Sequence, residues 1–297
     1  MRLWKVGKVK KVFQVSHTEL EFEFTDQISV FDKVIPTLVP RKGETLCRTS
    51  AYWFRRADTL GIKTHFKEVV APNRMRVQRV EIRENPCADD ANFLVPLEFI
   101  ARYYVAGSLL DRVESGKVDP ENLGLSSVHY GDELPEPLIE VTTKLEKVDR
   151  HIDRKEALRI SGLSTDEYDD ITETILRIDA DINTQVKKRG LIHVDGKKEF
   201  ALDEDRSIMV IDTYGTADED RFWDLEAYEE GECIELSKEF VRSYYRESGY
   251  HEKLYAARAE KRSEPDIPHL PEEMVKKTSR LYIDLYRKIT GEDIHES

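Results

Sequence analysis

The sequence predicts a mixed α+β fold in two parts, and three observations support this prediction. Residues 5–35 have β character, because apolar side chains alternate at Leu20, Phe22 and Phe24 as one face of a strand requires. The polar, proline-containing segment 84–92 then interrupts the chain, and the C-terminal third has the pattern of helices. A chain of 297 residues with 39% hydrophobic content is long enough to bury a core in each of two domains.

The first part also contains a helix and a further strand-like segment. We expect a helix over residues 44–60, with Gly61 just after it, because glycine readily adopts the left-handed conformation found at helix C-termini. Residues 69–82 are again strand-like. We place the domain boundary in the polar segment, so that a β-rich domain spans residues 1–88 and a second domain spans residues 89–297.

The second part opens with a strand and a short helix. Residues 94–105 are rich in aromatic and branched side chains, which are typical of strands. Ser108 and Asp111 fit a capping box at the start of a helix. Residues 113–140 contain several prolines and predict a region rich in loops.

Two long helices complete the predicted elements. The first spans residues 164–189, where Ser164 and Glu167 form a capping box. The second spans residues 271–290 and is closed by Gly291. Each helix has an apolar stripe that predicts core contacts: Ile171, Ile175, Ile178, Ile182 and Val186 in the first, and Met274, Val275, Leu281, Leu285 and Ile289 in the second.

A predicted β-hairpin between these helices gathers charged residues. The apolar runs 191–194 and 208–211 flank a turn-forming stretch, as in a hairpin. With residues 204 and 205 at the centre of the loop, Glu199 lies opposite Val210. The register of the hairpin therefore decides which charged side chains meet.

This register places two carboxylates together. Asp195, Lys197 and Glu199 share one face of the first strand, and Lys197 lies opposite Asp212. Glu199 and Asp212 are then diagonal neighbours roughly 7–8 Å apart at Cα, close enough to share a hydrated divalent cation. A solvated sheet face is the alternative interpretation, but the acids, arginine and aromatic residues of segment 218–223 favour a site.

Composition limits the classes of partner. The chain carries 46 Lys+Arg against 59 Asp+Glu, a net charge of −13, which argues against general nucleic-acid binding. Cys47, Cys87 and Cys233 are far apart and show neither zinc-ligand spacing nor a disulfide framework. The start lacks an apolar leader, and no apolar run reaches the length of a membrane span. We expect a cytoplasmic protein with no nucleic-acid or membrane partner.

Further candidate anion sites lie outside the hairpin. Gly7 precedes Lys8 and Lys10, which we expect on one strand face and which could bind phosphates, although solvent-facing lysines of a hairpin explain the same pattern. Asp32 ends the segment DQISVFD, where turn chemistry is an equal explanation.

Cations and hydroxyls also recur in the second part. Arg102 and Ser108 could bind one anion at the start of a helix, although an ordinary cap with a surface arginine explains them as well. Two more pairs suit an anion or merely solvent: Thr143 with Lys144, and Lys238 with Arg242.

The order of these segments resembles the phosphoribosylaminoimidazole-succinocarboxamide synthase (SAICAR synthetase) family, and the matches run over most of residues 5–245. The matching segments are GKVKKVF (7–13), DQISVFD (26–32), RKGETLCRTSAYWF (41–54), EFIARYYVAGS (98–108), LPEPLIEVTTK (134–144), LIHVDGKKEFAL (191–202), IDTYGTADEDRFWD (211–224) and SKEFVR (237–242).

The resemblance implies an ATP- and Mg²⁺-dependent ligase of purine biosynthesis. Such an enzyme joins L-aspartate to carboxyaminoimidazole ribonucleotide (CAIR) through an acyl phosphate and yields SAICAR, ADP and phosphate. By position, Gly7, Lys8 and Lys10 would bind ATP, and Glu199 and Asp212 would hold Mg²⁺. The catalytic residues would be Asp195, Lys197, Glu199 and Asp212, and the substrate-binding residues would be Asp32, Arg102, Ser108, Thr143, Lys144, Asp218, Arg221, Lys238 and Arg242.

The implied fold is α+β, with a β-rich N-terminal nucleotide lobe like the small lobe of kinases and an ATP-grasp-like domain with C-terminal helices. A homo-oligomer is compatible with the resemblance. The sequence departs from the family pattern at Gly196, Lys198, Ala201, Thr213, Ala217, Glu219 and Asp220. Two alternatives stay open: a catalytically silent, nucleotide-binding relative, or an ATP-dependent amide ligase with a different acceptor or amine.

Overall fold

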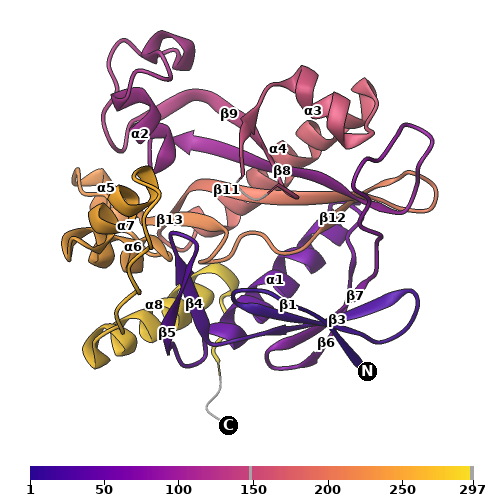
Figure 1. The fold of residues 1–297 in the computed structure, drawn as a ribbon, viewed down its shortest axis with the longest axis horizontal. Coiled ribbons are helices and arrows are strands. Elements are labelled where there is room, and N and C mark those ends of the chain that lie inside the picture. The colour runs from indigo at the N-terminus through magenta and orange to yellow at the C-terminus, as the bar shows by residue number, and fades with distance from the viewer. Residues whose placement is uncertain (147–148, 295–297) are drawn as a thin grey trace.

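The computed structural model describes residues 1–146 and 149–294, and it has a mixed α+β architecture (Figure 1). The N-terminal part forms an antiparallel five-stranded sheet in the order β1-β2-β3-β7-β6. The predicted alternation is confirmed, because Leu20, Phe22 and Phe24 of β3 are all buried. The strands are β1 (Arg2–Val6), β2 (Lys10–Gln14), β3 (Glu19–Phe24), β6 (Phe66–Ala71) and β7 (Arg74–Gln78).

Residues 69–78 are strands as predicted, but they belong to two strands, because β6 and β7 form a hairpin there. Pro72 and Asn73 lie at its turn, where proline cannot donate to the sheet. The side-chain amide of Asn73 donates a hydrogen bond to the Phe24 carbonyl at 2.8 Å, which ties the turn to the neighbouring β3.

A separate hairpin and a long helix complete the N-terminal part. Strands β4 (Gln27–Val30) and β5 (Lys33–Leu38) pair with each other, and the tip residues Phe31 and Asp32 have positive φ angles of 50° and 64°. Helix α1 (Lys42–Thr59) follows, and Gly61 takes a φ of 69° just after its end, as predicted.

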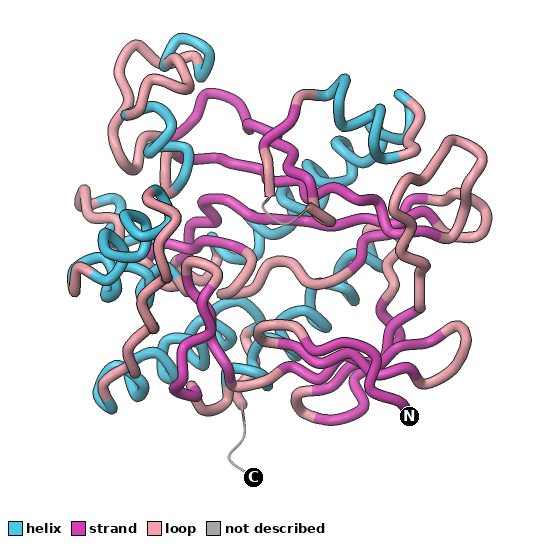
Figure 2. Tube along the Cα trace, in the orientation of Figure 1, coloured by secondary structure: helices cyan, strands magenta, loops and turns pink. Residues whose placement is uncertain are grey.

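The second part is built on a six-stranded sheet in the order β10-β9-β8-β11-β12, with β13 also paired to β11. Figure 2 shows its strands above those of the N-terminal sheet. The predicted strand 94–105 is confirmed as β8 to within one residue at each end, and the predicted strand 191–194 lies within the longer β11. The bounds are β8 (Phe93–Tyr104), β9 (Glu133–Thr143), β10 (His151–Ile152), β11 (Leu191–Leu202), β12 (Ile208–Ile211) and β13 (Asp220–Asp224).

The predictions for the segment after β8 hold only in part. Residues 115–132 are rich in loops as predicted, but residues 133–140 belong to the long strand β9, whose two prolines lie where its register with β8 shifts, so they disturb few ladder bonds. The predicted capping box is wrong. Ser108 does not cap helix α2 (Ser108–Glu114), because the cap position is Gly107 and has no side-chain hydrogen bond. The Ser108 hydroxyl instead accepts a hydrogen bond from Arg102 at 3.1 Å.

The two long helices are confirmed. Helix α4 (Thr165–Lys187) starts with the predicted capping box of Ser164 and Glu167, and helix α8 (Glu272–Thr290) ends at Gly291. The predicted stripe of α4 is buried throughout, and that of α8 is buried or half-buried against the core. The remaining helices are the 3₁₀ helix η1 (Pro120–Leu123), α3 (Arg154–Ser161), α5 (Leu225–Glu229), α6 (Glu239–Glu247) and α7 (Tyr250–Ala259).

The register of the β11–β12 hairpin differs from the prediction by one residue. Glu199 lies opposite Ile211 rather than Val210, because the loop spans residues 203–207 instead of centring on residues 204 and 205. The Asp203 carboxylate accepts hydrogen bonds from the backbone N–H groups of Asp205 and Ser207 at 2.9 Å each, and this side-chain turn sets the longer loop.

Backbone contacts join the two parts. The N–H of His65 donates to the Val210 carbonyl at 3.0 Å, and the N–H of Val210 donates to the Lys63 carbonyl at 2.9 Å. One hydrophobic core contains buried residues of both sheets and of α1, α4 and α8. Within residues 1–146 and 149–294, none of the helices has the length and hydrophobicity that a membrane crossing requires.

Candidate active site

Strand β11 places alternating side chains on two faces of the six-stranded sheet. One face borders a cleft of about 420 Å³, to which β11 contributes Asp195, Gly196 and Lys197. Helix α4 packs on β11. Because side chains of a strand alternate, Asp195, Lys197 and Glu199 share a face, as the sequence predicts.

Three lysines and three carboxylates meet at the end of this face, and we call them the lysine–carboxylate cluster: Lys10, Glu98, Lys144, Lys197, Glu199 and Asp212. Lys197 Nζ lies 2.8 Å from Glu199 Oε1 and 3.0 Å from Glu98 Oε1. Lys144 Nζ lies 2.5 Å from Glu199 Oε2, and Lys10 forms an ion pair with Asp212. The structure therefore brings the predicted cation-binding pair together with three of the predicted lysines.

The lysines keep two of these carboxylates ionised. Burial by itself raises the pKa of Glu199, which is only 2% exposed, but Lys197 and Lys144 outweigh it and hold the pKa well below the usual value. The pKa of Asp212 is also lowered, because Lys10 outweighs burial. Burial raises the pKa of Glu98, which lies opposite Glu199 on the neighbouring strand.

Asp212 has an unusual backbone conformation, with a φ of 60° just after β12. Its carbonyl oxygen lies 3.2 Å from Nε2 of the buried His65. Burial lowers the pKa of His65 to about 4, so the ring is neutral at neutral pH and can donate this hydrogen bond. A strained residue held by its surroundings is a common feature of functional sites.

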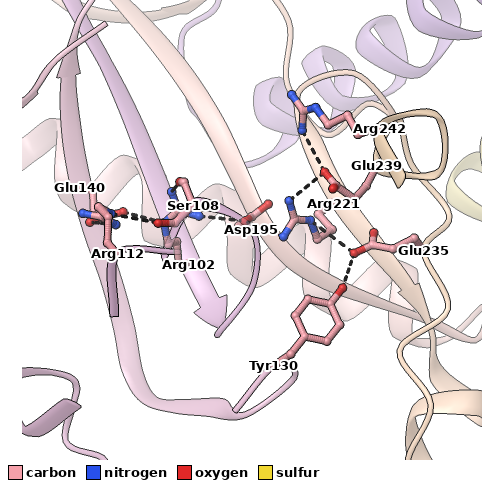
Figure 3. A network of polar contacts seen from close by, with 10 residues as sticks. All are labelled: Arg102, Ser108, Arg112, Tyr130, Glu140, Asp195, Arg221, Glu235, Glu239 and Arg242. Atoms are coloured by element: carbon pink, nitrogen blue, oxygen red, sulfur yellow. Dashed lines mark hydrogen bonds and ion pairs between the residues drawn. The ribbon is translucent and has the colours of Figure 1, made fainter. Parts of the chain in front are cut away.

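Arginines and carboxylates lie at the other end of the face, around the cleft. We call the arginines and the carboxylates that hold them the arginine network: Arg102, Arg112, Arg221, Arg242 and Arg246 with Glu140, Asp195, Glu235 and Glu239. Figure 3 draws it without Arg246. Arg102 donates to Glu140 at 2.6 Å, to Asp195 at 3.0 Å and to the Ser108 hydroxyl at 3.1 Å. Arg112 donates to the other oxygen of Glu140 at 2.5 Å. The guanidinium of Arg102 is thus held in one orientation, and the predicted pair Arg102 and Ser108 is in direct contact.

Arg221 lies on the other side of Asp195 from Arg102, between Asp195 and Glu239 of helix α6 (Figure 3). Its guanidinium is 3.8 Å from Asp195, 3.6 Å from Glu235 and 3.3 Å from Glu239. Within the part of the chain that the structure describes, its buried Nε and Nη1 atoms have no hydrogen-bond partner. A Cβ at Gly107 would lie 2.6 Å from Nη2 of Arg221, so glycine is required for this close approach.

Glu239 forms ion pairs with the two remaining arginines of the network. Its carboxylate lies 3.1 Å from Arg242 and forms an ion pair with Arg246. Burial raises the pKa of Glu239, but Arg221, Arg242 and Arg246 outweigh it and lower the pKa to about 2.

Asp218 and Lys238 lie in an adjoining hollow of about 220 Å³. Asp218 is bound at 2.7 Å by the fully buried Lys42 and at 2.6 Å by the hydroxyl of Tyr282. Burial lowers the pKa of Lys238, because Asp218 offsets only part of the cost of burying its charge. The hollow shares Asp195, Lys197 and Arg221 with the cleft.

Three predicted residues lie at the margin of the site or outside it. Gly7 forms the turn after β1, where its N–H donates to the Lys10 carbonyl at 2.8 Å, so Lys8 and Lys10 do not share a strand face as expected. Lys8 makes an exposed ion pair with Asp32 at 2.5 Å. The Thr143 hydroxyl accepts a hydrogen bond from the Arg150 backbone at 3.1 Å.

Sequence reasoning missed several acids that hold the cations: Glu98, Glu140, Glu235 and Glu239. A signal exists for Glu98, because it and Arg102 are the charged residues of the otherwise mainly apolar strand β8 and are four positions apart, on one face. Glu140 and Glu239 had no such signal, since β9 was predicted as loop and Glu239 belongs to an ordinary helix start.

The donor set at Glu199 and Asp212 fits a hard divalent cation that also binds phosphate. Among the described residues, no group of three or more His, Cys, Asp and Glu side chains could hold a metal ion alone. Two ionised carboxylates nevertheless suit Mg²⁺, which usually takes one or two protein carboxylates together with phosphates and water.

The chain resembles known proteins over most of its length. The family model described as SAICAR synthetase matches residues 3–257. The phosphoribosylaminoimidazole-succinocarboxamide synthase of Thermoplasma acidophilum is 52% identical over 293 residues, which cover 98% of this chain and 99% of that protein.

Solved structures show the same fold. A type-2 SAICAR synthetase in complex with ADP superposes with a TM-score of 0.73 and 26% identity, covering 99% of this chain and 100% of the other. The SAICAR synthase of Saccharomyces cerevisiae complexed with SAICAR gives a TM-score of 0.77 at 24% identity, covering 99% and 96% of the two chains. The chain therefore belongs to the SAICAR synthetase family.

Proposed function

We propose that this protein is an ATP-dependent ligase that joins L-aspartate to the carboxylate of CAIR and releases SAICAR, ADP and phosphate. The observation that carries the proposal is the shared face of β11. Asp195 borders the cleft of the arginine network, Glu199 belongs to the lysine–carboxylate cluster, and Lys197 contacts both regions. An anionic acceptor and a nucleotide triphosphate bound at these two places would meet at Lys197.

The lysine–carboxylate cluster is the proposed nucleotide end. Glu199 and Asp212 would hold Mg²⁺, and Lys10, with Lys8 and the Gly7 turn at the margin, would bind phosphates of ATP. The charges of the cluster favour binding of Mg²⁺ and phosphate. Its three ammonium groups now pair with three carboxylates, and each lysine can pair with a phosphate oxygen instead when the cation takes the carboxylates. When bound, Mg²⁺ supplies neutralisation of the phosphate charge that develops during transfer.

The arginine network is the proposed acceptor end. The unpartnered Nε and Nη1 atoms of Arg221 are buried donors, and such groups are costly unless a ligand satisfies them. Arg102 and Ser108 would bind the same nucleotide. The other residues proposed to contact the substrates are Asp32, Thr143, Lys144, Asp218, Lys238 and Arg242.

The residues of this face suit an acyl-phosphate route. A carboxylate oxygen of the acceptor attacks the γ-phosphorus of ATP, and ADP leaves. The amine of aspartate then attacks the activated carbonyl carbon, phosphate leaves, and the amine loses a proton. Lys197 stabilises the charge between phosphate and acceptor, and Asp195 orients the guanidinium groups of Arg102 and Arg221, so positioning and charge account for catalysis.

The proposal includes the division into lobes 1–88 and 89–297, with the nucleotide between them. It also includes a cytoplasmic protein with small-molecule substrates and no nucleic-acid partner, which can assemble as a homo-oligomer. The relative from Thermoplasma acidophilum and the ADP complex of the type-2 enzyme support the ligase and its nucleotide.

The test is an assay of purified protein with Mg²⁺-ATP, CAIR and L-aspartate. We expect ADP and phosphate in equal amounts, and only when all three substrates are present. ATP binding without turnover would instead establish a catalytically silent relative. Turnover with a different amine or acceptor, but not with these substrates, would establish an altered amide ligase. Removal of Mg²⁺ with a chelator should stop the reaction, and adding the metal back should restore it.

A further inference from the structure

A second set of charged side chains lies buried on the face of β11 that points away from Lys197 and Glu199. Lys198 is 0% exposed, and its Nζ lies 2.5 Å from Asp179 Oδ1 and 3.9 Å from Asp220 Oδ2. Asp179 belongs to α4 and also accepts a hydrogen bond from the Tyr103 hydroxyl at 3.0 Å. Asp220 Oδ2 lies 2.7 Å from Nε2 of the buried His193. We call these residues the Lys198 cluster: Tyr103, Asp179, His193, Lys198 and Asp220.

The cluster depends on glycine at position 196. Gly196 pairs with Asp220 across β11 and β13. A Cβ at Gly196 would lie 2.0 Å from Asp220 Oδ2 and 2.8 Å from His193 Nε2, so no other residue fits unless Asp220 moves. The structure therefore brings Gly196, Lys198 and Asp220 together.

Asp220 connects this cluster to the cleft through the backbone of β13. Its neighbour Glu219 pairs with Lys197 at 3.2 Å. Its other neighbour, Arg221, directs its guanidinium toward Asp195, with which its backbone also pairs. Any shift of Asp220 therefore moves a cation of the arginine network and an acid that contacts Lys197.

A buried ion pair is weak support for stability, because apolar residues of similar volume often stabilise a protein as well or better. Removing one partner is different, since it leaves a charge buried without compensation. Lys198 of β11 links two other elements, because its Nζ lies 2.5 Å from Asp179 of α4 and 3.9 Å from Asp220 of β13. The geometry therefore suits a structural role, in which these residues fix the positions of β11, β13 and α4 relative to one another.

We propose that Lys198, Asp179 and Asp220 are positioning residues that hold β13 against β11, so that Arg221 meets the acceptor nucleotide in its binding orientation. This inference rests on the proposed ligase function. It assigns to side chains that bind one another on the far side of β11 from Lys197 an effect that falls mainly on the acceptor nucleotide.

The test is a comparison of steady-state constants for Lys198→Met and for the double variant Lys198→Met, Asp179→Asn. In the single variant two carboxylates face each other without a cation, so Asp220 shifts and the KM for CAIR rises roughly tenfold. The KM for ATP should rise much less, within about twofold, because among the described residues Lys10 and Asp212 pair with each other and not with Lys198, Asp179 or Asp220. The double variant removes the uncompensated charge, while Asp220 keeps His193 and the Gly215 N–H, so the KM for CAIR returns to within roughly threefold of the wild type.

Asp181→Asn is the matched control. Asp181 lies on the same helix as Asp179, but it pairs with Arg56 of α1 at 2.6 Å. Its loss should lower the unfolding temperature and leave both KM values unchanged. If Lys198→Met does not fold, Gly196→Ala gives the same readout, because its Cβ displaces Asp220 directly.

The outcomes separate the two levels of the argument. Absence of ligase turnover in the wild-type protein defeats the proposed function. Wild-type turnover, combined with folded variants whose two KM values are unchanged or rise equally, defeats the positioning role and leaves the ligase standing. A rise in the KM for CAIR that Asp179→Asn does not relieve also defeats it, because the carboxylates would then not be coupled through Lys198.

Discussion

The lysine–carboxylate cluster and the arginine network lie at two ends of one strand face, yet they hold their charges differently. In the cluster, the carboxylates of Glu199 and Asp212 are bound by flexible ammonium groups. In the network, Arg102 is fixed by three oxygen partners at once. An ammonium is a mobile point charge, whereas a guanidinium in a fork of carboxylates is rigid.

This difference indicates that the two regions have different roles in binding. The cluster can exchange partners when a nucleotide and its cation arrive, because each lysine can turn from a carboxylate to a phosphate. The network is held more firmly, since Arg102 is fixed by three oxygen atoms and Arg221, which lines the cleft, lies among Asp195, Glu235 and Glu239. We therefore expect substitutions in the cluster to affect the chemical step and substitutions in the network to affect the affinity for the acceptor.

Neutralising either carboxylate of the proposed cation pair should have the largest effect. Glu199→Gln and Asp212→Asn each remove a negative ligand while keeping the side-chain shape, so kcat should fall by roughly 10³-fold or more. Steady-state kinetics and circular dichroism check that turnover is lost and the fold is kept. Glu23→Gln, which touches only Lys11 and Arg74 of the N-terminal sheet, is the control with near-normal rates. A near-normal rate in either cluster variant would remove the metal assignment.

The charge pairing of the arginine network should make the unfolding free energy fall at acidic pH. Glu239 has a pKa of about 2 in the folded protein, against 4.5 as its ordinary value. Because the folded pKa is depressed, its contribution is fully present above pH 4.5 and is lost as the pH falls toward 2, and it amounts to roughly 3 kcal/mol of unfolding free energy.

Urea unfolding at a series of pH values measures this contribution. The difference in unfolding free energy between the wild type and Glu239→Gln should shrink below pH 4.5, because protonation removes the same charge that the substitution removes. A difference that stays constant down to pH 3 would show that the arginines around Glu239 do not stabilise its ionised form.

Combining Arg102→Ala with Ser108→Ala should weaken binding at the acceptor end. The double substitution removes a guanidinium and a hydroxyl proposed to hold the nucleotide, and it leaves Glu140 and Asp195 with fewer cationic partners. We expect the KM for CAIR to rise roughly 10²-fold while the KM for ATP changes little. An unchanged KM for CAIR would place its phosphate elsewhere in the molecule.

The sequence predicted the parts of this comparison that depend on local patterns. The alternation of Asp195, Lys197 and Glu199 and the apolar stripe of α4 follow from side-chain periodicity, the strand β8 follows from its aromatic and branched content, and the structure contains all three. The resemblance correctly indicated the family, and it named cations at both ends of the face.

Sequence reasoning failed where a tertiary partner decides the outcome. The exact register of the hairpin depends on Asp203 accepting two backbone hydrogen bonds, which made the loop one residue longer than expected. Strand β9 was obscured by its prolines, which are tolerated because the ladder with β8 is already irregular there. Glu239 carries no local signal, since its role depends on arginines from β13 and α6 that only the fold brings together.

The smallest predicted effect separates two lysines that the sequence treats alike. Lys8 and Lys10 both follow Gly7, but Lys8 makes an exposed pair with Asp32, whereas Lys10 pairs with Asp212 inside the cluster. Exposed pairs typically contribute little, so Lys8→Ala should leave the unfolding temperature unchanged and raise the KM for ATP by about two- to threefold. Lys10→Ala in the same assay should have a much larger effect on turnover, because it removes the cation that keeps Asp212 ionised. Equal effects of the two substitutions would mean that the nucleotide reaches Lys8 as closely as Lys10, and the proposed nucleotide end would then extend to the tip of the β4–β5 hairpin.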